Sequence, residues 1–131
     1  MELDRTTWWV ISAGVPRGVI RLKWLSANAP VADRDFMVAL ERFGDIAAEH
    51  DSTGLLQDLR ALGRRLSPDL SRWIDEELIP RYQRQGIARW AFATGSDPSL
   101  NQSIVNGTLT RRFFATEAAA TTWLAHTQRK G

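Results

Sequence analysis

The central apolar run of the chain lies between Gly54 and Pro68 and predicts a buried strand. Its leucines follow a glycine without the polar alternation of a half-exposed strand, which is typical of a strand covered on both faces. These leucines are Leu55, Leu56 and Leu59. Asp58 and Arg60 lie where this strand should end, at the sheet edge where open α/β folds bind ligands and partners. The simpler interpretation of Asp58 is a turn cap or an ion pair with a neighbouring arginine.

An antiparallel hairpin is predicted at the start of the chain. The residues from Thr7 to Ala13 are rich in β-branched and aromatic side chains, and Val19 to Trp24 alternate between apolar and polar. Glycine and proline between Gly14 and Gly18 supply the turn, and Ser26 to Pro30 should end the hairpin.

Two amphipathic helices are expected on either side of the central strand. Asp33 can cap the first, from Arg34 to Glu49. Its apolar face is Phe36, Leu40, Phe43 and Ala47, and its polar side carries Arg42, Asp45 and Glu49. The second helix should start at Pro68, because Ser67 can accept a hydrogen bond from a free backbone N–H and proline loses nothing at the first helical position.

The second helix has a distinct acidic side. Its inward positions are Leu70, Trp73, Ile74 and Leu78, and its outward positions are Asp75, Glu76 and Glu77. Pro80 should kink or restart the helix, since an interior proline removes a hydrogen bond and crowds the preceding turn. Gly86 is the expected left-handed stop.

The last third of the chain predicts strand, helix, strand and helix in turn. A buried strand is expected over Ala88–Thr94, followed by a short helix between Gly95 and Gly107 and a strand over Arg112–Ala115. The short helix would begin at Asp97 and Pro98 and end at Asn106. In the final helix, Thr116 is the expected cap, the inward residues are Ala119, Ala120, Trp123 and Leu124, and the basic end is Arg129 and Lys130.

Together these elements predict a single α/β domain over residues 1–131, with a mixed sheet opened by the hairpin and covered by about four helices. The length and the apolar fraction of 44% suit one compact soluble domain. No stretch approaches the roughly 20 apolar residues of a membrane span. The opening residues, MELDRTT, also lack the pattern of a signal peptide, so we expect a cytoplasmic protein with no integral membrane association.

The charge and residue types leave little room for catalysis. The chain has no cysteine, and 17 basic against 15 acidic residues give a net charge of only +2, so we expect no nucleic-acid partner. His50 and His126 should lie near helix ends without a second ligand at metal spacing. The chain shows no phosphate loop, nucleophile elbow or dinucleotide fingerprint. We therefore expect a protein that is not an enzyme and uses no cofactor or metal.

The segments LLQDLRAL, SPDLSRWIDEELIPRYQRQGIARWAFATG and RRFFATEAAATTWL, together with the opening hairpin, resemble the SpoIIAA-like branch of the STAS superfamily, often labelled STAS/SEC14-like and common in bacteria. The resemblance implies this fold and a binding or regulatory role. Some members of the family carry an Asp-Ser-x-Gly phosphorylation switch after the central strand. This chain departs from that pattern, and Ser67 is its nearest hydroxyl in a comparable place.

Two hypotheses on function follow. The first is a protein-interaction or regulatory module that uses the helix from Pro68 to Arg84 and the loops near Asp58 and Ser96; Arg60 and Ser67 belong to the same surface. The second is a carrier or sensor of a small apolar molecule, held between sheet and helix by Phe36, Phe43, Trp73 and Trp90. An enzymatic alternative would centre on Asp58 and Arg60.

Six tryptophans are many for this length, and core packing explains most of them. Adjacent Trp8 and Trp9 must point to opposite faces of one strand, so one of them could remain at the surface. An exposed aromatic on an edge hairpin favours self-association, and we therefore expect a homodimer.

Overall fold

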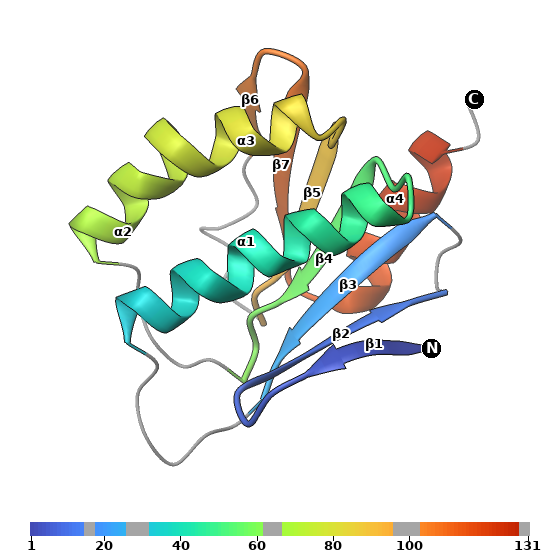
Figure 1. The fold of residues 1–131 in the computed structure, drawn as a ribbon. Helices are drawn as coiled ribbons and strands as arrows, with labels where there is room; N and C mark the ends of the chain where they lie inside the picture. The colour runs from blue at the N-terminus through green and yellow to red at the C-terminus, as the bar shows by residue number, and fades with distance from the viewer. Residues whose placement is uncertain (15–17, 26–31, 62–66, 96–102, 129–131) are drawn as a thin grey trace.

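The computed structural model describes residues 1–14, 18–25, 32–61, 67–95 and 103–128, and confirms an α/β arrangement around a mixed sheet (Figure 1). In these residues the sheet has seven strands in the order β1-β2-β3-β4-β5-β7-β6. The strands are β1 (Glu2–Arg5), β2 (Trp9–Ala13), β3 (Val19–Trp24), β4 (Gly54–Asp58), β5 (Arg89–Ala93), β6 (Ser103–Asn106) and β7 (Leu109–Phe114). The pairs β3–β4, β4–β5 and β5–β7 are parallel, and the outer pairs are antiparallel.

Helices cover both faces of the sheet. On one face lie α1 (Asp33–Glu49) and a continuous helical segment made of α2 (Pro68–Trp73), the π-helical turn η1 (Ile74–Leu78) and α3 (Ile79–Arg84) (Figure 1). On the other face α4 (Glu117–Gln128) buries Ala120 and Leu124 against Val19, Leu56 and Ala91 of the sheet. The central strand β4 is buried along its whole length, as its leucines predict.

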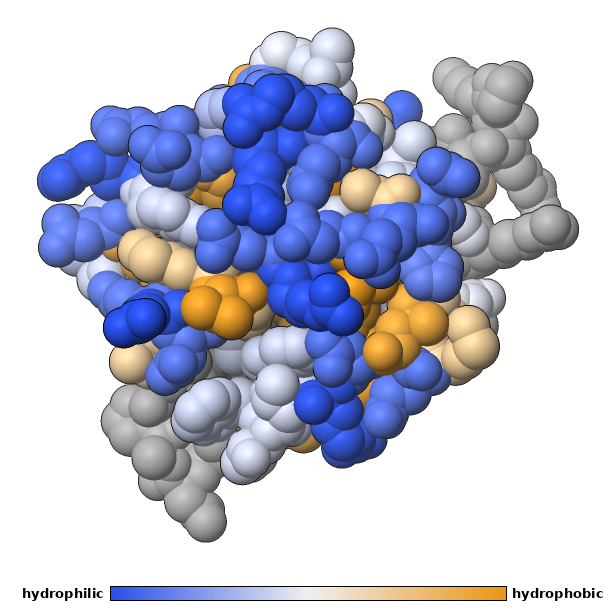
Figure 2. All heavy atoms as spheres, viewed as in Figure 1, coloured by the Kyte–Doolittle hydropathy of each residue, from blue (hydrophilic) through white to orange (hydrophobic). Residues whose placement is uncertain are grey.

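The face formed by α1 and α2–α3 is largely hydrophilic, with small separate hydrophobic patches between the charged side chains (Figure 2). Beneath it lies the larger of two buried clusters, which contains the predicted inward residues of both helices except Trp73, which is partly buried against it. The apolar stripes of these helices therefore face the core, as their spacing predicts.

The start of α1 differs from the prediction. Ala32 is the N-cap residue, without a side-chain cap, and Asp33 is the first residue of the helix. The Asp33 carboxylate instead accepts a hydrogen bond of 2.6 Å from Ser67 Oγ, while Ser67 caps α2 by accepting from the Leu70 N–H at 3.0 Å. The two helix starts are thus joined by one hydroxyl, which serves as both donor and acceptor.

Pro80 restarts the second helix without stopping it. The chain forms the π-helical turn η1 directly before α3, and Pro80 sits in the first turn of α3. A proline has no N–H and its ring crowds the carbonyl four residues earlier, so a wider turn accommodates it at low cost. Gly86, with φ of +87°, follows the end of α3 as predicted.

The short helix predicted between Gly95 and Gly107 is wrong for the part that the structure describes. Ser103–Asn106 is the strand β6, which pairs with β7, and Gly107 begins the tight turn between Asn106 and Leu109. Glycine is favoured at the first central position of a two-residue hairpin turn, and the left-handed φ of +57° at Gly107 suits that turn. The described residues therefore contain three helical segments, α1, α2–η1–α3 and α4, and not about four.

Three smaller predictions also change. β7 starts at Leu109, earlier than expected, because it must pair with β6. Ala119 is exposed, since the buried stripe of α4 follows Ala120 and Leu124. The opening hairpin is not an edge, because β1 pairs with β2 along its outer side. Trp9 is buried and Trp8 is half-buried against the main core, so an exposed edge aromatic does not support a homodimer.

Several predictions concern residues outside the described part of the chain. They are the hairpin end at 26–30, the helix start at Asp97 and Pro98, the candidate site residue Ser96, the helix end at Arg129 and Lys130, and the side chain of His126.

Candidate functional site

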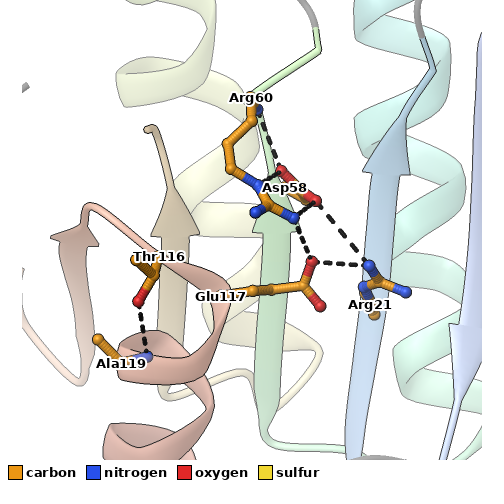
Figure 3. Close-up of polar contacts among 6 residues, drawn as sticks. All are labelled: Arg21, Asp58, Arg60, Thr116, Glu117 and Ala119. Carbon is orange, nitrogen blue, oxygen red and sulfur yellow. Dashed lines mark hydrogen bonds and ion pairs between the residues drawn. The ribbon is translucent and has the colours of Figure 1, made fainter. Parts of the chain in front are cut away.

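Four charged side chains meet at the carboxyl end of the parallel strands (Figure 3). Arg21 comes from β3, Asp58 is the last residue of β4, Arg60 follows two residues later, and Glu117 begins α4. Arg21 and Glu117 are far in sequence from Asp58 and Arg60. The parallel register places Arg21 and Asp58 on neighbouring strands and on the face covered by α4. We refer to these four residues as the charged cluster.

Asp58 and Arg60 form the inner pair of the charged cluster. Arg60 donates from Nε to Asp58 Oδ1 at 2.9 Å and from Nη2 to Oδ2 at 2.8 Å, and its backbone N–H donates to Oδ1 at 3.1 Å. The Asp58 side chain is only 3% exposed. This two-pronged geometry is the strong form of an arginine–carboxylate pair, and it confirms the simpler interpretation of Asp58 as the partner of a neighbouring arginine.

Glu117 closes the charged cluster from the opposite side. Its Oε2 accepts from Arg21 Nη2 at 2.7 Å and from Arg60 Nη2 at 3.1 Å. Arg21 Nη2 also lies 3.9 Å from Asp58 Oδ2. Two cations therefore share two carboxylates, and the start of α4 is tied to the end of the central strand. Thr116 caps this helix by accepting from the Ala119 N–H at 3.1 Å.

The charged cluster strongly favours the ionised form of Asp58. Burial by itself raises the pKa of the Asp58 carboxyl, but hydrogen bonds from the Arg60 guanidinium and from the Arg60 backbone N–H outweigh it and hold the pKa at about 2. The same pairing raises the pKa of Arg60. A carboxylate with a pKa so far below neutrality is a weak proton acceptor, so the arrangement suits structural support and charge recognition better than general base catalysis.

Sequence reasoning found only half of the charged cluster. Asp58 and Arg60 were marked by their place at a strand end, whereas Arg21 and Glu117 were missed. Arg21 carried one signal, as a charged residue at an alternating strand position, and Glu117 carried another, as the acidic residue directly after the helix cap Thr116. Neither signal identifies its partner, because contacts across 96 residues depend on the sheet order.

The remaining predicted site residues that the structure describes lie on the other face of the sheet. Asp75, Glu76 and Glu77 are exposed on η1, and Asp75 pairs with Arg111 of β7 at 3.3 Å. Trp73 is half-buried against the main core, and Ser67 serves as the helix cap described above. The structure therefore brings Asp58 and Arg60 together but separates them from the acidic turn.

The aromatic residues expected to line an apolar cavity lie in the main core. Phe36 stacks on Trp24 with ring centres 4.8 Å apart, and the ring centres of Trp90 and Tyr82 are 5.0 Å apart. Phe43 is fully buried. Trp24 Nε1 is buried without a hydrogen-bond partner, which leaves one polar group in this layer unsatisfied.

Three general observations complete the description of the site. In the described residues no group of three or more metal-ligating side chains converges, and none of their helices has the length and apolarity needed to span a bilayer. Comparison of the chain with protein-family models, with curated proteins and with solved structures found no match in any of the three.

Proposed function

We propose that the chain is a non-enzymatic regulatory or protein-interaction module of the STAS-like type, and that a basic partner docks on the acidic turn formed by Asp75, Glu76 and Glu77. The observation that carries this proposal is the exposure of three consecutive carboxylates on the π-helical turn, between buried Ile74 and Leu78. The resemblance of the sequence to the STAS superfamily supports the same role.

The acidic turn is only partly neutralised within the chain. Asp75 is paired with Arg111, but Glu76 and Glu77 have no ion-pair partner among the described residues. Neighbouring like charges repel, and a partner with a basic surface relieves this repulsion. π-Helical turns are uncommon and occur often at functional sites, and this one is fixed in place by Pro80 and by two buried side chains.

Reversal of the free carboxylates is the direct test. We expect the double variant Glu76→Lys/Glu77→Lys to lower partner capture from a lysate of its native cells by about tenfold or more, because attraction becomes repulsion at the docking surface. The measurement is quantitative mass spectrometry of proteins retained on the immobilised chain, followed by titration of the retained partner in purified form.

The matched control is Glu2→Lys/Glu49→Lys, which makes the same charge change at two exposed positions on β1 and at the end of α1. Capture by this control should stay within about twofold of the unmodified chain, as expected for charges away from the interface. Equal capture by both double variants, with circular dichroism showing that both are folded, would contradict the proposed docking surface.

A carrier of a small apolar molecule is the second candidate function. The unsatisfied Trp24 Nε1, next to the stacked ring of Phe36, favours it, because a buried donor without an acceptor is costly and a ligand with a polar atom would satisfy it. In this case native mass spectrometry should show a reproducible extra mass on the folded chain that disappears on denaturation. Trp24→Phe, which keeps an aromatic ring and removes the donor, should reduce that mass peak. Spectra with peaks only at whole multiples of the chain mass would count against a carrier.

A further inference from the structure

A pocket of about 340 Å³ opens beside the charged cluster, on the sheet face that α4 covers only in part. It lies between β2, β3 and the first turns of α4, and its walls are Met1, Ser12, Ala13, Arg21, Glu117 and Thr121. The acidic turn is on the opposite side of the sheet and contributes nothing to it. This volume is at the lower end of the range of small-molecule sites.

Both charged side chains of this pocket keep free hydrogen-bonding groups. The two arginine contacts of Glu117 go to Oε2 alone, and Oε1 has no partner among the described residues (Figure 3). Arg21 uses only Nη2 in the charged cluster, and its Nη1 forms no hydrogen bond among the described residues, whereas its Nε is buried without a partner. The side chains are 29% exposed for Arg21 and 24% for Glu117. A ligand can therefore bind both residues without breaking their ion pair.

The free groups define what the pocket can recognise. Arginine N–H groups bind a carboxylate in a planar fork, and a carboxylate oxygen accepts strongly from an ammonium group. The hydroxyls of Ser12 and Thr121 form no side-chain hydrogen bond within the described residues, and both can add a donor or an acceptor. A ligand with only a negative charge would meet repulsion from Glu117, and one with only a positive charge would meet repulsion from Arg21.

We propose that this pocket binds a free α-amino acid. The ligand carboxylate pairs with Arg21, the ligand ammonium group pairs with Glu117 Oε1, and the ligand side chain lies toward Ala13 and Thr121. An α-amino acid carries its opposite charges on adjacent carbons, which matches two protein charges whose nearest atoms are 2.7 Å apart. The site is separate from the proposed partner surface and does not depend on it.

The test is a titration of the full chain with each of the common α-amino acids, followed by isothermal calorimetry and by amide chemical shifts. We expect at least one amino acid to bind and to shift the amides of β2, β3 and the start of α4. The N-acetyl derivative and the carboxamide of that amino acid should each bind about tenfold more weakly or worse, since each lacks one of the two charges. Absence of binding across the whole panel, or equal affinity for the N-acetyl derivative, would overturn the proposal.

Two variants of α4 separate pocket filling from general disturbance of the helix. Thr121→Phe fills the pocket without replacing any residue of the charged cluster and should weaken binding by about tenfold or more. Thr122→Phe places the same ring on the neighbouring exposed position and should leave affinity within about twofold. Unchanged binding by folded Thr121→Phe would also overturn the site. The Glu76→Lys/Glu77→Lys variant should bind the amino acid normally, so failure of the docking surface and failure of this pocket are distinguishable.

Discussion

Gly44→Ala is expected to lower the free energy of unfolding by about 2–3 kcal/mol, although alanine is the better helix former. Gly44 of α1 faces Tyr82 of α3, and a Cβ atom there would overlap Tyr82 Cε1 and lie only 2.9 Å from Tyr82 Cδ1. The Tyr82 ring cannot move aside easily, because it is fully buried and its hydroxyl donates to the Leu40 carbonyl oxygen. The measurement is equilibrium unfolding in urea.

A double-mutant cycle identifies the cause. Tyr82→Val removes the ring atoms that a Cβ at position 44 would meet, at a cost of about 3 kcal/mol of its own. In this background Gly44→Ala should change sign and gain about 0.5–1 kcal/mol, because only the helix propensity of alanine remains. Gln85 Oε1, at 2.7 Å from the same Cβ position, is the end of a flexible side chain and can rotate away. An equal loss in both backgrounds would show that the ring contact is not responsible.

The elements that the sequence predicted well are those set by local pattern. The leucines of β4, the apolar stripe of α1 and the Ser67-Pro68 start of α2 each depend on neighbours within a few residues, and each is found as expected. Asn106-Gly107 shows the limit of this approach, since the same pair of residues suits a helix end or a hairpin turn. Pairing with β7 decided between them, and such pairing depends on distant parts of the chain.

The charged cluster shows the same limit at the level of the site. Arg60 lies two residues from Asp58, so their pair follows from sequence distance alone. Glu117 joins the cluster only because α4 follows β7 and packs across β5 and β4 on the second face of the sheet. Strand order is a property of the whole fold. For this reason the strand-end prediction located the site but did not give its complete composition.

Asp58→Asn is expected to remove about 2 kcal/mol of stability at pH 7 and to change how stability depends on acid. The pKa of Asp58 in the folded chain, about 2, is below the ordinary value of 3.8. A carboxyl with a depressed folded pKa stabilises the folded state above its unfolded pKa and loses that contribution as the pH falls toward the folded pKa. The difference in unfolding free energy between the unmodified chain and Asp58→Asn should therefore be constant from pH 7 to about 5 and should shrink between about pH 4 and pH 2.

Two further variants separate the carboxyl itself from its surroundings. Arg60→Gln removes the two-pronged partner, so the pKa of Asp58 in the folded chain should rise, and the acid-dependent loss of stability should become smaller and be complete at a higher pH. Asp69→Asn is the matched control, because this carboxylate is 85% exposed and only 3.7 Å from Arg72; it should change stability by less than about 0.5 kcal/mol at pH 7. If the stability of the unmodified chain and of Asp58→Asn fell in parallel from pH 5 to pH 2, Asp58 would not be the group that couples the charged cluster to folding. A convergence of the two curves would instead show that the end of β4, and through Glu117 the attachment of α4, is stabilised by one buried carboxylate.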